Sequence, residues 1–85
     1  MIIHRLDPPP PGIVAGMLGD ELKKARLKAE LTQEQVAARA RISREYVSQM
    51  ERNRQSPTVV MLLRVCRILG TPASQIIARV ERTGR

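Results

Sequence analysis

The chain has 85 residues, which suits one domain and excludes a multidomain enzyme, because a chain this short buries too little apolar surface for two cores. Hydrophobic residues make up 42% of it and charged residues 27%, a globular balance, and one tyrosine is the only aromatic residue, so the core must be aliphatic. The formal net charge of +7 favours a polyanionic partner over a neutral or cationic one.

The single cysteine, Cys66, cannot form an internal disulfide, which excludes a stapled secreted miniprotein and favours a reducing compartment. The apolar start of the chain is too short for a signal peptide. No uncharged apolar stretch approaches the roughly 20 residues that span a bilayer. We therefore expect a cytoplasmic protein with no membrane partner.

Residues 1–16 are predicted to form a proline-rich N-terminal extension. The prolines within residues 7–12 lack backbone donors and favour an extended chain, so we expect them to break any regular element. The domain is then expected to cover residues 17–82. Two interpretations of the extension stay open: a tail of little consequence, or a segment whose apolar residues dock on a partner protein or a second subunit.

From Met17 onward, apolar spacing and capping residues predict five helices and no strands, so the expected fold class is all-α. Thr32 and Ser43 are predicted N-caps, the first of them in a capping box with Gln35. Gly70 is expected to end the fourth helix in a left-handed conformation. The predicted helices cover about residues 18–29, 33–39, 44–52 and 59–69, with a fifth that begins after Pro72.

Residues 33–52 are predicted to form two short helices joined by a sharp turn. Ala37 is the small residue that allows a close crossing, with aliphatic support from Val36, Ala40, Ile42, Val47 and Met50. The second helix of the pair then keeps a polar face free, made of Arg44, Glu45, Ser48, Gln49 and Arg52. A helix of this width fits the major groove of duplex DNA, which is about 12 Å wide.

Three motifs stand at a characteristic spacing: LTQEQVA at residues 31–37, ISREYVSQME at 42–51 and Ser-Pro-Thr at 56–58. Over about residues 17–78, the chain resembles the helix-turn-helix family of phage lambda repressor and Cro, also called the XRE family. The resemblance implies a compact five-helix, lambda repressor-like fold. It also implies sequence-specific binding of double-stranded DNA by a homodimer.

The resemblance implies two sets of DNA contacts. Base edges would be read by Arg44, Glu45, Ser48 and Gln49, and these residue types suit guanine, cytosine and adenine edges. The DNA backbone would be contacted by Gln33, Arg52, Asn53 and Arg54, which set affinity and register rather than sequence preference. Gln33 is also expected to brace the side chain of Arg44. The other interpretation of this charge cluster is an ordinary solvated face.

Two charged residues, Arg26 and Glu51, fall on inward faces of their predicted helices. Each charge would be costly if buried alone and tolerable if paired. The family that the chain resembles has an Arg and a Glu at these positions as an internal salt bridge. We therefore expect an ion pair between Arg26 and Glu51 with a structural role.

Two positions depart from the family pattern. Arg41 stands in the turn where the family usually has Gly, and a left-handed Arg costs roughly 1 to 2 kcal/mol. Glu30 replaces the common Gly that ends the first helix. Neither change reaches a base-reading position, so we expect altered local geometry rather than altered function.

The fourth predicted helix is apolar on more than one side. One stripe is assigned to the core: Val59, Leu62, Leu63, Cys66 and Leu69. The surplus apolar face, together with the fifth helix, is assigned to a homodimer interface, because contiguous exposed apolar surface is unusual on a monomer. The predicted interface residues are Met61, Val65, Ile68, Ile76, Ile77 and Val80. The alternative is that all of these residues belong to the core.

One His and one Cys far apart provide neither a metal cluster nor a nucleophile with its base, so we expect no metal, no cofactor and no enzymatic activity. Two interpretations of Tyr46 stay open: it packs against the scaffold, or it contacts DNA. The predicted function is a homodimeric transcriptional regulator, with repression as its expected action, on an inverted-repeat operator. The alternative is an antitoxin or adaptor that binds a partner protein through residues 1–16 or the last helix.

Overall fold

The computed structural model describes the backbone of residues 11–83 and the side chains of residues 18–82. These described residues form five helices and no strand, so the all-α prediction is confirmed. In chain order the helices are α1 (Pro11–Lys28), α2 (Gln33–Ala40), α3 (Arg44–Glu51), α4 (Val59–Leu69) and α5 (Ala73–Thr83).

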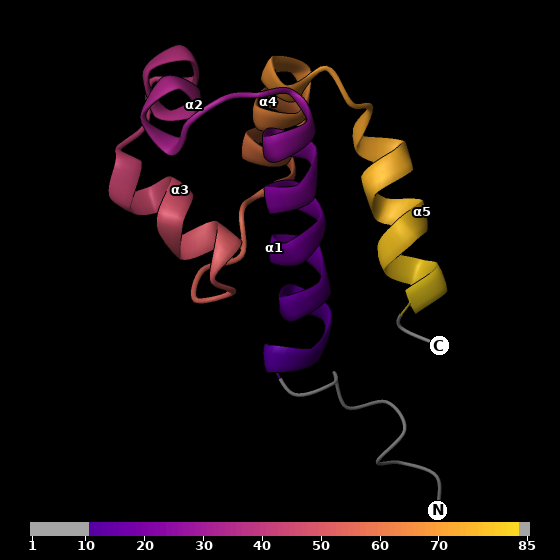
Figure 1. The fold of residues 1–85 in the computed structure, drawn as a ribbon. Coiled ribbons are helices and arrows are strands. Elements are labelled where there is room, and N and C mark those ends of the chain that lie inside the picture. The colour runs from indigo at the N-terminus through magenta and orange to yellow at the C-terminus, as the bar shows by residue number, and fades with distance from the viewer. Residues whose placement is uncertain (1–10, 84–85) are drawn as a thin grey trace, which may run out of the picture.

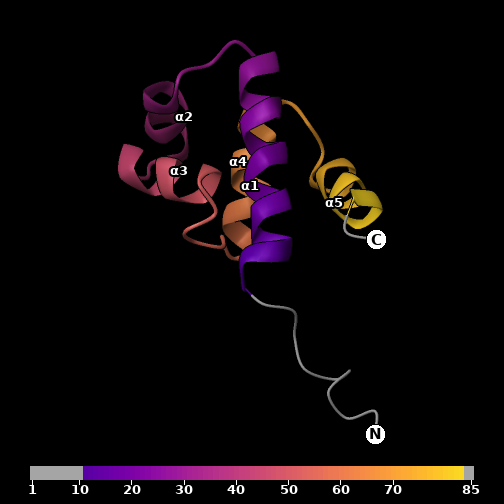
Figure 2. The same cartoon turned by 60° about the horizontal axis from the view of Figure 1, so that its bottom comes forward.

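Helix α1 runs through the middle of the fold (Figure 1). Helices α2 and α3 lie on one side of it and α5 lies on the other, and the turned view shows the same arrangement (Figure 2). Helix α4 contacts α1, α2 and α5. The helix pair α2–α3 is therefore held by α1 and α4, on the side of the domain away from α5.

Helix α1 begins at Pro11 rather than near Leu18, so the expectation that residues 7–12 break any regular element was wrong at Pro11 and Gly12. The physical reason is that the first turn of a helix needs no backbone donor, and the fixed φ of proline suits its first position. The last proline of the run therefore starts the helix. Predictions that concern residues 1–10 lie outside the described part of the chain, and the division at residue 16 stays a prediction.

The predicted caps are confirmed. Thr32 Oγ1 accepts a hydrogen bond from the backbone N of Gln35 at 3.0 Å, and Gln35 Oε1 accepts one from the backbone N of Thr32 at 2.9 Å. Ser43 Oγ accepts from the backbone N of Tyr46 at 3.0 Å. Gly70 ends α4 with φ 75°, a left-handed conformation that glycine adopts without steric cost. These local bonds fix where each short helix starts and stops.

The core is aliphatic, as the composition requires. It consists of Leu22, Ala25, Val36, Ala37, Ala40, Val47, Met50, Leu62, Val65, Cys66, Leu69 and Ile76. Burial raises the pKa of the Cys66 thiol by disfavouring its charged form, so this cysteine packs as a small apolar residue. Tyr46 is half-buried and packs against the same core, which places it on the scaffold.

The inward face of α4 differs from the predicted one, and this corrects the predicted interface. Val65 is only 3% exposed and Ile76 is fully buried, so neither is available to a second subunit. Conversely, Val59 and Leu63, which were assigned to the core, are 72% and 51% exposed. The buried residues of α4 follow one i, i+3, i+4, i+7 pattern, so α4 turns a single face to α1, α2 and α5: Leu62, Val65, Cys66 and Leu69.

Arg41 and Glu30 both have φ 59°, the left-handed conformation that glycine adopts easily, so the expectation of altered local geometry at these two positions was wrong. Arg41→Gly is expected to raise the free energy of unfolding by about 0.5 to 1 kcal/mol, since glycine removes the steric cost but adds unfolded-state entropy. Arg39→Gly is the matched control, because it removes the same charge from an exposed helical position. It should lower stability by about 1 kcal/mol in the same denaturation experiment. A lower stability of Arg41→Gly would contradict the prediction.

Candidate nucleic-acid interface

Helix α3 presents a polar face to solvent and an apolar face to the core. Val47 and Met50 are 2% and 3% exposed, and they fix the helix on the body of the domain. On the other face, Arg44 and Glu45 are exposed, and Ser48 and Gln49 are half-buried. The four predicted base-reading residues therefore lie together along one side of a short, rigidly packed helix.

Two acidic residues contact the long side chains of Arg44 and Gln49. Glu34 Oε2, on the first turn of α2, lies 3.0 Å from Arg44 Nε, and both side chains are exposed. Within α3, Gln49 Nε2 donates a hydrogen bond to Glu45 Oε2 at 3.0 Å. The expected brace of Arg44 by Gln33 is not formed among the described residues, where Gln33 Nε2 donates to Glu51 Oε1.

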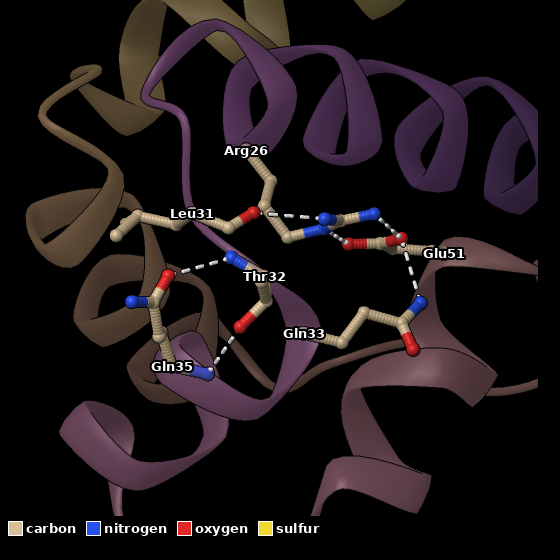
Figure 3. Close-up of polar contacts among 6 residues, drawn as sticks. All are labelled: Arg26, Leu31, Thr32, Gln33, Gln35 and Glu51. Carbon is tan, nitrogen blue, oxygen red and sulfur yellow. Dashed lines mark hydrogen bonds and ion pairs between the residues drawn. The ribbon is translucent and has the colours of Figure 1, made fainter.

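Arg26 and Glu51 form the predicted ion pair, and both are buried (Figure 3). Arg26 Nε donates to Glu51 Oε2 at 2.6 Å, and Nη2 donates to Oε1 at 3.0 Å. The third nitrogen, Nη1, donates to the backbone carbonyl of Leu31 at 2.9 Å. Gln33 Nε2 donates to Glu51 Oε1 at 3.0 Å. This network joins α1, the start of α2 and the end of α3 into one unit.

The segment after α3 is bound closely to that helix. The backbone N of Arg52 donates to Ser48 O at 2.9 Å, and the backbone N of Arg54 donates to Gln49 O at 2.8 Å. Both arginine side chains are exposed, whereas Asn53 is half-buried with φ 62°. The predicted backbone-contacting residues thus follow α3 directly, on a turn whose geometry its hydrogen bonds determine.

Gly19 is a part of the site that sequence reasoning missed. It is buried in α1, where an added Cβ would lie 2.5 Å from the backbone O of Met50 and 2.8 Å from that of Glu51, and would overlap Asn53 Oδ1. The Asn53 oxygen is itself buried, without a hydrogen-bond partner among the described residues. A glycine inside a helical pattern is the signal that could have pointed to this close approach. Its absent side chain lets α1 pack on the last turn of α3.

Among the residues that the structure describes, no group of three or more His, Cys, Asp or Glu residues is placed to hold a metal ion. None of the helices in that part of the chain is long and apolar enough to cross a membrane by itself. By length and composition alone, one pair of helices together would be long and apolar enough, Val59–Leu69 with Ala73–Arg82, which are bent by 107° relative to each other.

Comparisons with known proteins agree with this geometry. A family model described as helix-turn-helix matches residues 22–76. An uncharacterized HTH-type transcriptional regulator, y4dJ of Sinorhizobium fredii, is 33% identical over 67 residues, which cover 79% of this chain and 87% of the relative.

Solved structures share the fold. The clp gene regulator ClgR from Corynebacterium glutamicum superposes with a TM-score of 0.80 at 26% identity, over 92% of this chain and 97% of that one. The restriction-modification controller protein C.Esp1396I, a tetramer in complex with its natural 35 base-pair operator, has a TM-score of 0.73 at 24% identity over 84% and 93% of the two chains, and this likeness shows the fold alone. The chain belongs to the XRE-type helix-turn-helix family and is a DNA-binding transcriptional regulator.

Proposed function

We propose that the protein binds an inverted-repeat operator as a homodimer, with α3 of each subunit in the major groove, and that it represses transcription by occupying promoter DNA. The observation that carries this proposal is the polar face of α3. Arg44 and Glu45 on that face are exposed and Ser48 and Gln49 are half-buried, while Val47, Met50 and Glu51 on the opposite face are buried and fix the helix against the domain. A rigid helix of this kind is suited to direct readout of base edges.

The base contacts would come from Arg44, Glu45, Ser48 and Gln49. Arg44 is exposed beside Glu34, which approaches it most closely at Nε, and its terminal nitrogens suit the O6 and N7 acceptors of guanine. Glu45 and Gln49 are hydrogen-bonded to each other in the free protein. On DNA, this bond would be exchanged for contacts to cytosine N4 and to an adenine edge.

The backbone contacts would come from Gln33 and from the turn after α3. Gln33 donates one amide hydrogen to Glu51, which leaves the second for a phosphate oxygen at the start of α2. Arg52 and Arg54 are exposed cations on a turn held by α3, and Asn53 lies between them. Contacts of this kind fix the position of a protein on the duplex without specifying sequence.

The homodimer would use an exposed apolar surface on α4 and α5, which differs from the interface predicted from the sequence. Four large apolar side chains on these helices are exposed: Val59 at 72%, Val60 at 67%, Leu63 at 51% and Ile77 at 44%. Beside Leu63, a shallow hollow lined by Val60, Arg64 and Arg67 can receive a side chain of a second copy. Met61, Ile68 and Val80 are half-buried and stay in the proposed interface at its edge. Two subunits double the number of base pairs read.

The same proposal covers where and how the protein acts. It belongs to a family of DNA-binding transcriptional regulators, and such a protein acts in the compartment that contains the DNA. We place it in the cytoplasm and assign it no catalytic activity and no cofactor, because occupancy of DNA is sufficient for regulation. Control would then depend on its own concentration or on a partner.

The DNA contacts are tested by comparing Arg44→Ala with Arg54→Ala on a preferred duplex and on single-base variants of it. Arg44→Ala should lose about 1 to 3 kcal/mol of discrimination at one position in each half-site. Arg54→Ala removes the same type of side chain but should weaken binding equally on all sequences and reduce the salt slope by about one. Equal, sequence-independent losses in both variants would contradict the assignment of Arg44 to a base.

The dimer surface is tested by sedimentation of Leu63→Lys. A charge at this position should shift the protein from dimer to monomer and weaken binding to the full operator, because the interface would have to bury an unpaired ammonium group. Leu27→Lys is the matched control: Leu27 is 57% exposed on α1, outside the proposed surface, so this variant should stay dimeric. Dimers of unchanged affinity in Leu63→Lys would remove the proposed surface.

A further inference from the structure

Glu34 is an acidic residue on the DNA-binding side of the fold that has no role among the contacts assigned so far. It lies in the first turn of α2, next to Gln33, and its Oε2 atom is 3.0 Å from Nε of Arg44 at the start of α3. A carboxylate there repels phosphates and thus opposes non-specific binding to DNA. Its position against the principal base-reading cation requires an explanation.

We propose that Glu34 is a positioning residue that raises the sequence selectivity of Arg44, because its ion pair with the guanidinium keeps that charge from the phosphate backbone. This inference rests on the proposed function, because it assumes that Arg44 reads a base. Glu34 would then contribute to the discrimination between DNA sequences rather than to the overall affinity for DNA.

The geometry of the pair supports this role. A guanidinium has two terminal nitrogens that form the forked edge used for a guanine, and a third nitrogen, Nε, on its side. The closest approach of Glu34 is to Nε, on the side of the group, so the carboxylate can stay near Arg44 while the fork contacts a base. An unpaired Arg44 could instead turn toward the phosphates, where it would strengthen binding to every sequence equally.

The exposure of the pair fits a contact that is made and exchanged. The side chains of Arg44 and Glu34 are 58% and 66% exposed, so the pair is solvated and adds little to stability. A pair of that strength biases the orientation of Arg44 without locking it. The buried pair of Arg26 and Glu51 is the contrast in this protein, since it is suited to a fixed structural role.

A separate role of Glu34 is also consistent with its place in the chain. A carboxylate in the first turn of a helix interacts favourably with the helix dipole, and this effect does not involve Arg44. The two roles differ in one measurable respect. Stabilisation of α2 would act on stability, and it would not depend on whether residue 44 is an arginine.

The test compares Glu34→Gln with the wild type in two duplexes, one that carries the preferred sequence and one that does not, over a series of salt concentrations. Loss of the carboxylate should raise affinity for the non-specific duplex more than for the preferred one. We expect the ratio of the two dissociation constants to fall about two- to fivefold, the range of an exposed ion pair. The salt slope on non-specific DNA should steepen by about one contact.

Two controls isolate the effect. Glu81→Gln makes the same change in net charge on an exposed position of α5, on the side of the domain away from α3, and should leave the ratio unchanged (Figure 1). In an Arg44→Ala background, Glu34→Gln should not alter the ratio, because no guanidinium is left to hold. A change of equal size in that background would assign the effect to charge or to helix stability and overturn the inference.

The outcomes separate this inference from the function on which it rests. A wild-type protein with no preferred duplex would remove the proposed function, and the role of Glu34 in selectivity with it. A selective wild type whose ratio is the same after Glu34→Gln overturns the role of Glu34 alone. A ratio that falls only when Arg44 is present supports both.

Discussion

Arg26→Ala is expected to lower the free energy of unfolding by about 3 to 5 kcal/mol, because it would leave the carboxylate of Glu51 buried without its cation. Glu51 is 7% exposed, and among the described side chains the amide of Gln33 would be its remaining hydrogen-bond partner. The loss would also free the carbonyl of Leu31 from Nη1 of Arg26. The effect should be large because three helices meet at this pair.

Denaturant unfolding measures this effect, and a double-mutant cycle of wild type, Arg26→Met, Glu51→Leu and Arg26→Met/Glu51→Leu measures the coupling. The double variant should be more stable than either single variant, since apolar replacement of a buried pair removes both charges together. Lys24→Ala is the control on the same helix, because Lys24 is exposed in its pair with Glu21 and should cost less than about 1 kcal/mol. Absence of coupling between Arg26 and Glu51 would contradict a structural role for the pair.

Gly19→Ala is expected to destabilise the fold by about 2 kcal/mol, although alanine is the better helix former. The gain in helix propensity is about 1 kcal/mol. Against it stands a methyl group that would lie 2.5 Å and 2.8 Å from two backbone carbonyl oxygens at the end of α3, and overpacking costs typically about 1 to 3 kcal/mol or more. Backbone atoms cannot rotate away as a side chain can, so the steric cost should exceed the gain in helix propensity.

The contribution of the side chain of Asn53 to this clash can be separated from that of the backbone. Asn53→Gly removes the buried oxygen and suits the positive φ at this position, so it should not destabilise the protein. In the Asn53→Gly background, Gly19→Ala should still lower stability, because the carbonyls of Met50 and Glu51 remain. Full recovery in the double variant would show that only the Asn53 side chain was in the way. A more stable Gly19→Ala would contradict the close approach itself.

Much of this fold is local in origin, and for that reason it could be predicted. The caps at Thr32, Ser43 and Gly70 each depend on residues a few positions apart. The pair of Arg26 and Glu51 could be anticipated because a charge on an inward helix face needs a partner. The polar face of α3 followed from the same periodicity that buries Val47 and Met50.

The rest depends on how the helices pack, and the sequence alone does not determine that packing. Helix α4 is apolar on several sides, so periodicity alone did not determine that Val65 is buried and Leu63 is exposed. The close contact at Gly19 exists only because the end of α3 lies against α1. Likewise, the contact of Glu34 with Arg44 depends on the angle between α2 and α3, which no spacing rule supplies. The start of α1 was missed because the last of several prolines opens that helix.

The central claim is that α3 reads a base sequence, and selection of bound duplexes from a randomised DNA pool tests it most directly. The purified protein should be used at a fixed, near-physiological salt concentration, because affinity for DNA depends steeply on salt. The expected result is enrichment of an inverted repeat with half-sites about one helical turn apart. A pool in which no sequence is enriched, with residual binding that vanishes as salt rises, would contradict groove reading by α3 and would direct the search to a protein partner.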